Sequence, residues 1–106
     1  MTGSRIEKLQ ALVQSNPGDA RARFFLASEW LRVSEWKSAA AEFEAYLASE
    51  PADPGSARRS LGLCYERMGR DADAVAAYRQ AVGEALACGH SGLAEEIRGL
   101  LEDLEA

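Results

Sequence analysis

The sequence contains very few of the residues that most often carry out chemistry. Its 106 residues include one histidine and two cysteines. Because a Ser-His-Asp triad needs a histidine beside a nucleophile, His90 alone gives little from which to build a hydrolytic site. A closed zinc site needs four ligands, whereas Cys88 and His90 supply only two and Cys64 falls inside a predicted helix. We therefore expect no enzyme, no metal site and no cofactor.

Long apolar runs and a secretion signal are also missing. No segment approaches the roughly 18 apolar residues that a membrane-spanning helix needs. The first residues, Met1 to Arg5, lack the apolar stretch of a signal peptide. Two cysteines are too few for a disulfide framework, so both are expected to be reduced thiols. These observations predict a cytoplasmic protein that does not bind membranes.

Positive charge is scarce as well. The chain has 12 Lys and Arg against 17 Asp and Glu, a formal net charge of −5. This balance argues against a nucleic-acid-binding protein, which usually shows a basic excess on one face. With nine glycines, three prolines and 47% apolar residues, the composition is that of a globular chain. The length fits a single domain over residues 1–106.

The sequence does contain an internal repeat with an offset of 35 residues. Residues of similar size and apolar or aromatic character recur at this offset without a gap: Leu26 and Leu61, Ala27 and Gly62, Trp30 and Tyr65, Ala39 and Ala74, Phe43 and Tyr78. Self-similarity at such a period indicates stacked structural units. Between the repeated positions, apolar residues recur every three or four residues, as in amphipathic helices.

This periodicity predicts six helices and no strands. The first begins at an N-cap Ser4 and ends near Asn16; the second is capped by Asp19 and ends at Ser34. The others begin at Trp36, near Asp53 or Ser56, near Asp71, and after Gly92. Their apolar stripes are expected to include Ile6, Leu9, Leu12, Val13, Ala22, Leu26, Ala27, Trp30, Val33, Ala39, Ala40, Phe43, Tyr46, Leu47, Ala57, Leu61, Gly62, Tyr65, Met68, Ala74, Val75, Tyr78, Ala81, Val82, Leu86, Leu93, Ile97, Leu100, Leu101 and Leu104.

The repeated residues resemble the tetratricopeptide signature L-G-x-x-Y…A-x-x-x-F…P, with Pro51 closing the first copy. The resemblance implies a right-handed superhelix of antiparallel helix hairpins, an all-α solenoid. It divides the chain into a half repeat at residues 5–17, repeats at 20–53 and 55–88, and a C-terminal capping helix at 91–105. Such folds hold other molecules, which favours a protein-interaction scaffold.

The sequence departs from the family pattern at Arg23 and Arg58, which stand where an aromatic residue is usual. Both arginines are interpreted as covering apolar surface with their aliphatic stems, with their charged heads in water.

The resemblance also implies that the first helix of each hairpin lines a concave groove. The expected partner-binding residues are Arg21, Phe24, Ser28, Leu31, Arg32, Ser56, Arg59, Leu63, Glu66, Arg67 and Arg98. Ala94 and Leu101 extend this set if the last helix continues the same layer. The arginines can bind carboxylates of a partner, and the apolar residues between the arginines can contact its apolar side chains. This combination favours an acidic peptide or helix as the partner.

Three other interpretations compete with acidic-peptide binding. The arginines can form an ordinary solvated face paired with nearby glutamates. The chain can self-associate as a homo-oligomer through its terminal helices. Either the half repeat at the N-terminus leaves an unfilled edge that docks on a second copy, or the acidic last helix occupies the arginine-lined groove of a second copy. A metal-dependent enzyme is the remaining alternative, which the residue inventory disfavours.

Overall fold

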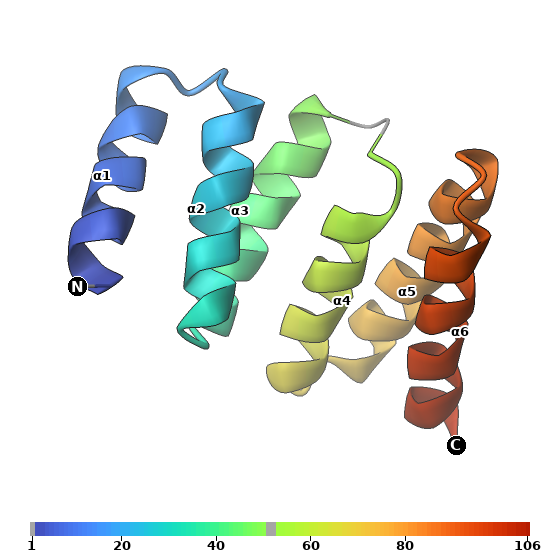
Figure 1. Ribbon diagram of the computed structural model, residues 1–106. Helices are drawn as coiled ribbons and strands as arrows, with labels where there is room; N and C mark the ends of the chain where they lie inside the picture. Colours follow the sequence, from blue (N-terminus) through green and yellow to red (C-terminus); the bar gives the residue numbers. More distant parts are fainter. Residues whose placement is uncertain (1, 51–52) are drawn as a thin grey trace. The chain divides into compact units, whose positions relative to one another are not determined.

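The structure is a computed structural model that describes residues 2–50 and 53–106. In these residues all regular secondary structure is α-helical, as the sequence predicts. The helices are α1 (Thr2–Ser15), α2 (Ala20–Arg32), α3 (Trp36–Ser49), α4 (Ser56–Arg67), α5 (Asp71–Ala87) and α6 (Ser91–Glu105) (Figure 1).

The chain divides into two compact units, Met1–Pro51 and Ala52–Ala106, called here the N-terminal and C-terminal units. In the N-terminal unit, α2 packs against both α1 and α3. In the C-terminal unit, α5 packs against both α4 and α6. The repeat boundaries and the single domain expected from the sequence stay predictions. Pro51, the expected closing proline, lies outside the described residues.

Three of the interhelical turns share one backbone motif. The residue after the C-cap has positive φ at Ser34, Gly69 and Gly89, with values of 61°, 76° and 75°. In each turn the next residue donates its N–H to a carbonyl five residues back, as Arg70 does to Tyr65. This is the Schellman arrangement, which satisfies carbonyls at the end of a helix and reverses the chain. The recurring turn therefore makes a hairpin of each helix pair, α2 with α3, α4 with α5, and α5 with α6.

Two aspartates fix the starts of the first helices of the hairpins. Asp19 caps α2, because its side chain accepts a hydrogen bond from the Ala22 N–H at 3.1 Å. Asp53 is buried and accepts from the N–H groups of Gly55 and Ala57 at 3.0 and 3.1 Å. The sequence left open whether the next hairpin begins at Asp53 or Ser56. The structure begins α4 at Ser56, and Asp53 accepts hydrogen bonds from the backbone at the start of that helix.

The N-terminal unit has an apolar core between α1 and α2. Ile6, Val13, Ala22 and Leu26 are buried there, and Leu9, Trp30 and Val33 pack against them. These residues belong to the apolar stripes expected from the sequence. The core therefore fixes α1 against α2.

In the C-terminal unit the α4–α5 contact depends on one small and one large residue. Tyr78 of α5 is fully buried, and a Cβ atom placed on Gly62 of α4 would lie 2.6 Å from the Tyr78 ring. A side chain at position 62 therefore has no room while the tyrosine is in place. This close approach explains why the repeat places a small residue opposite an aromatic one.

Three details of the expected helices are wrong. Ser4 lies inside α1 rather than at its N-cap, because the helix already begins at Thr2. Leu12 and Leu86 are 55% and 46% exposed, although both were placed in apolar stripes. Each is a direct neighbour of a buried residue, Val13 or Ala85, and a helix turns by about 100° per residue, which carries the leucine out of the packed face.

Candidate functional site

The expected partner-binding residues fall on both units. Arg21, Phe24, Ser28, Leu31 and Arg32 lie on α2, whereas Ser56, Arg59, Leu63, Glu66 and Arg67 lie on α4 and Arg98 lies on α6. All of them are at least partly exposed. Ala94 is fully buried, so the expectation that it extends the set is wrong. That the faces of α2 and α4 form one groove stays a prediction.

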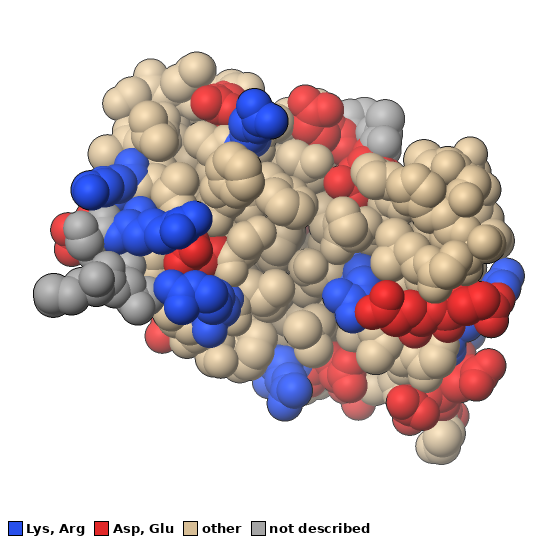
Figure 2. Space-filling model, viewed as in Figure 1, with Lys and Arg blue, Asp and Glu red and all other residues tan. Residues whose placement is uncertain are grey.

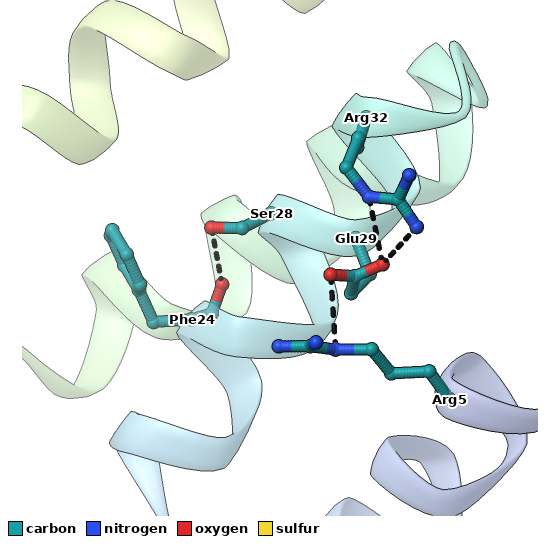
Figure 3. A network of polar contacts seen from close by, with 5 residues as sticks. All are labelled: Arg5, Phe24, Ser28, Glu29 and Arg32. Atoms are coloured by element: carbon teal, nitrogen blue, oxygen red, sulfur yellow. Dashed lines mark hydrogen bonds and ion pairs between the residues drawn. The ribbon is translucent and has the colours of Figure 1, made fainter. Parts of the chain in front are cut away.

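Arg32 is engaged in an ion-pair network that the sequence did not reveal (Figure 3). Its guanidinium donates two hydrogen bonds to Oε2 of Glu29, at 3.2 and 2.9 Å. The Nε atom of Arg5 on α1 lies 3.1 Å from the other oxygen of the same carboxylate. One carboxylate therefore serves two arginines and links α1 to α2.

Glu29 is only 8% exposed, yet its carboxylate remains charged because of these arginines. The hydrogen bonds from Arg32 are the main cause that lowers its pKa below 4.5. The positive charges of Arg32 and Arg5 act in the same direction, while burial opposes them. The only sequence signal for this pair was the spacing of three residues between Glu29 and Arg32, which brings side chains together on a helix.

Two other expected residues of α2, Phe24 and Ser28, make contacts within the N-terminal unit. The Phe24 ring makes edge-on contacts with Phe43 and Tyr46 of α3, with centroids 5.9 and 5.1 Å apart. The Ser28 hydroxyl donates to the carbonyl of Phe24 at 2.9 Å (Figure 3). Phe24 therefore contributes to the α2–α3 contact, while the next residue, Phe25, is 47% exposed. Sequence reasoning missed Phe25 because neighbouring aromatic residues give no indication of which one is buried.

In the C-terminal unit, two of the expected arginines form ion pairs, and one of these pairs joins two helices. Arg59 of α4 pairs with Glu96 of α6, and Arg98 pairs with Glu95 on the same helix. Glu66 accepts a hydrogen bond from the buried Tyr78 hydroxyl at 2.8 Å. Burial, followed by the contact with Glu66, raises the pKa of Tyr78, so the phenol stays protonated and donates. Glu66 thus supports the α4–α5 contact.

Arg23 and Arg58 differ from their interpretation as residues with solvated heads. Arg23 pairs with Glu42 of α3 at 3.1 Å, and Arg58 pairs with Glu84 of α5 at 3.0 Å. All four side chains are at most 20% exposed. Each guanidinium therefore joins the two helices of its hairpin. The charged heads lie in the interface because a carboxylate of the second helix meets them there.

Among residues 2–50 and 53–106, no helix is both long and apolar enough to cross a bilayer. The same residues contain no group of three or more histidine, cysteine, aspartate or glutamate side chains placed to hold a metal ion.

The repeated hairpins, their shared turn and the small-to-aromatic packing define a helical repeat protein. The chain belongs to the tetratricopeptide repeat family, because the family model described as "Tetratricopeptide repeat" matches residues 1–86. The family resemblance noted from the sequence is therefore confirmed. A comparison with curated proteins finds no match.

Solved structures support the same fold. The crystal structure of PcrH in complex with the chaperone binding region of PopD matches with a TM-score of 0.89 at 19% identity, covering 98% of this chain and 78% of that one. Two crystal structures of MamA match with TM-scores of 0.69 and 0.70 at 23% and 24% identity. They cover 98% and 97% of this chain, which spans 62% and 66% of the MamA chains. These matches confirm the all-α helical repeat fold.

Proposed function

We propose that this chain is a protein-interaction scaffold that binds an acidic peptide or partner helix through the arginine-bearing faces of α2 and α4. Membership of the tetratricopeptide repeat family supports a binding role, because stacked helix hairpins present extended surfaces to partners. PcrH, which has the same fold, was crystallised with the chaperone binding region of PopD. This precedent supports a segment of another protein as the ligand.

The observation that carries the proposal is the accessibility of the arginines. Arg21 and Arg32 on α2, and Arg67 on α4, are exposed, and the Arg59 side chain is 37% exposed. The Arg59–Glu96 pair is open to solvent, and exposed ion pairs contribute only about 0–1 kcal/mol. A partner carboxylate can therefore replace the internal one and gain a bidentate contact with the guanidinium.

The competing interpretation is that these arginines form only a solvated face. The pairs Arg32–Glu29 and Arg59–Glu96 are the contacts which that interpretation expects. The two interpretations differ in what happens when the arginines change sign. If the arginines bind an acidic partner, reversing their charge abolishes its capture. If they form only a solvated face, reversing their charge leaves capture unchanged.

A pull-down from a native lysate with the double variant Arg32→Glu, Arg59→Glu tests the proposal. We expect the acidic partners captured by the wild type to be lost. Arg79→Glu is the matched control, because Arg79 is also exposed and also pairs with a glutamate, Glu105, but lies on α5. Equal capture by all three proteins would contradict the proposal and favour the solvated face.

Self-association remains the alternative function. One route to it, besides docking of the N-terminal half repeat on a second copy, places the acidic face of α6 in the arginine-bearing surface of a second copy. Three of the acidic residues of α6 already pair with arginines of their own chain: Glu95 with Arg98, Glu96 with Arg59, and Glu105 with Arg79. These internal pairs leave α6 with less charge for a second copy, which favours an external acidic partner.

A further inference from the structure

The N-terminal unit exposes two large apolar side chains on helices that pack against each other. Leu12 of α1 is 55% exposed and Phe25 of α2 is 47% exposed. In the described part of the chain, Leu86 is the other large apolar residue with comparable exposure. Single exposed apolar residues are common on protein surfaces, whereas apolar residues that lie together and are rimmed by polar ones mark interaction sites.

The Arg5–Glu29 ion pair shows which side of α1 lies next to which side of α2. The two helices run in opposite directions (Figure 1). Leu12 lies seven residues after Arg5, and Phe25 lies four residues before Glu29. Seven residues are about two turns of helix and four residues are about one turn. Leu12 therefore lies on the same side of α1 as Arg5, and Phe25 lies on the same side of α2 as Glu29. Because the helices are antiparallel, both apolar residues lie to the same side of the ion pair.

The same helical spacing adds positive charge to this edge. Lys8 follows Arg5 by three residues, while Arg21 and Arg32 lie four before and seven after Phe25. We call the set Arg5, Lys8, Leu12, Arg21, Phe25 and Arg32 the α1–α2 edge. Figure 2 shows lysine and arginine side chains gathered over α1 and α2 on the viewed face.

The charge of the α1–α2 edge is only partly neutralised within the chain. Two of its four basic residues, Arg5 and Arg32, share one carboxylate, that of Glu29. Among the described residues, neither Lys8 nor Arg21 makes an ion pair. The edge therefore keeps a net positive charge around two apolar side chains, in a chain whose net charge is −5.

We infer that the α1–α2 edge docks an acidic segment of a partner protein, which seats a large apolar side chain against Phe25 and Leu12 and places carboxylates on Arg21, Arg32 and Lys8. This inference rests on the proposed function and locates its main contact in the N-terminal unit. Charge complementarity selects the acidic segment, because the edge offers guanidinium groups for carboxylates. Aromatic residues with arginine neighbours are typical of the residues that dominate binding energy.

Selection of random displayed peptides on the full chain tests this inference. We expect the enriched sequences to combine acidic residues with one large apolar residue. The most enriched peptide, labelled with fluorescein, then gives a Kd by anisotropy for each variant.

We expect Phe25→Ser and Leu12→Ser to weaken binding by about tenfold or more, since truncation of central apolar residues has effects of this size. Leu86→Ser is the matched control, because Leu86 is equally exposed but lies on α5, and its Kd should equal that of the wild type.

Each outcome separates the inference from the function on which it rests. Enriched peptides without the acidic and apolar composition, or an unchanged Kd for Phe25→Ser, would overturn the α1–α2 edge while leaving peptide binding intact. If Phe25→Ser fails to fold by circular dichroism, Arg21→Glu gives the same test from an exposed position. Absence of any enrichment would contradict the proposed function as well. A dimer of the peptide-free wild type that Phe25→Ser abolishes would assign the edge to a second copy and contradict the inference.

Discussion

At the scale of single residues, Ser34 has a backbone conformation that the other hairpins give to glycine. Its φ is 61°, where Gly69 and Gly89 have 76° and 75°. A residue with a Cβ atom loses about 1 kcal/mol in the left-handed region. We therefore expect Ser34→Gly to raise the free energy of unfolding by up to about 1 kcal/mol, measured by urea denaturation followed by tryptophan fluorescence.

The reciprocal change at Gly69 is the matched control for Ser34. A Cβ atom on Gly69 would meet no other atom within 4 Å, so only its positive φ opposes a side chain. Gly69→Ser should therefore destabilise the chain by about the amount that Ser34→Gly stabilises it. Equal stability of the wild type and both variants would show that the left-handed backbone carries no cost in these turns.

The two cysteines have opposite environments and should react at different rates. Cys64 is fully buried in α4, and burial raises the pKa of its thiol to about 11. At pH 8 only about one Cys64 thiol in a thousand would be ionised, and that one is shielded from reagents. Cys88 is exposed at the end of α5. We expect a thiol reagent to label Cys88 promptly and Cys64 only after unfolding.

The variant Cys88→Ser isolates the buried thiol in the labelling experiment. It should show no prompt labelling in buffer and one labelled thiol in denaturant. Prompt labelling of native Cys88→Ser would mean that α4 opens readily. The interpretation of Cys64 as a packed residue would then fail.

Glu29 should make the N-terminal unit sensitive to acid. Its folded pKa lies below 4.5, so its contribution to stability is present above that pH and is lost as the pH falls through the folded pKa. Both tryptophans, Trp30 and Trp36, lie in the N-terminal unit and report its unfolding. We expect the wild type to lose more stability than Glu29→Gln on acidification below pH 4.5. Parallel losses in both proteins would contradict the ion-pair network of Figure 3.

At the scale of helices, the α4–α5 contact depends on the complementarity of Gly62 and Tyr78. Because a Cβ atom at position 62 would already clash with the ring, Gly62→Leu should lower the free energy of unfolding by about 1–3 kcal/mol. Leu61 is 4% exposed, and Leu61→Ala should cost about 2–5 kcal/mol through lost contacts and a cavity. Thermal melting followed by circular dichroism measures both changes.

Gly83 provides the control for the Gly62 substitution. It lies in the interior of α5, where a Cβ atom would meet no atom within 4 Å. Gly83→Leu should therefore be neutral or slightly stabilising, because leucine favours the helix more than glycine does. A similar loss of stability at positions 62 and 83 would contradict close packing against Tyr78 as the reason for the effect at Gly62.

At the scale of the whole molecule, binding and self-association make different predictions for the free chain. If the α1–α2 edge serves an external acidic segment, the free chain should sediment as a monomer of 11.5 kDa over a wide range of concentration. The alternative predicts a dimer that weakens with salt, because screening reduces attraction between exposed charges. It also predicts that removing residues 93–106 abolishes the dimer, which analytical ultracentrifugation of the shortened chain would detect.

The fold could be predicted from the sequence to the level of individual helices. The offset of 35 residues identified equivalent positions, and Asp19, Gly69 and Trp36 marked helix ends that the structure confirms. These features are local, since caps, turns and helical periodicity depend on residues within a few positions of one another.

The candidate site was less predictable from the sequence than the helices were. Phe25 and Leu12 were missed, because their exposure depends on how α2 turns relative to α1 and α3.

The sequence by itself determined the family, the helical repeat and the alternation of small and large residues across each hairpin. Only the tertiary structure decided which charges meet. Arg23 and Arg58 pair with glutamates 19 and 26 residues away, and Arg5 reaches Glu29 from another helix. Helix formation depends on neighbours along the chain, whereas an ion pair depends on two side chains that only packing brings within about 4 Å. The position of the exposed basic edge therefore followed from the packing of α1 on α2.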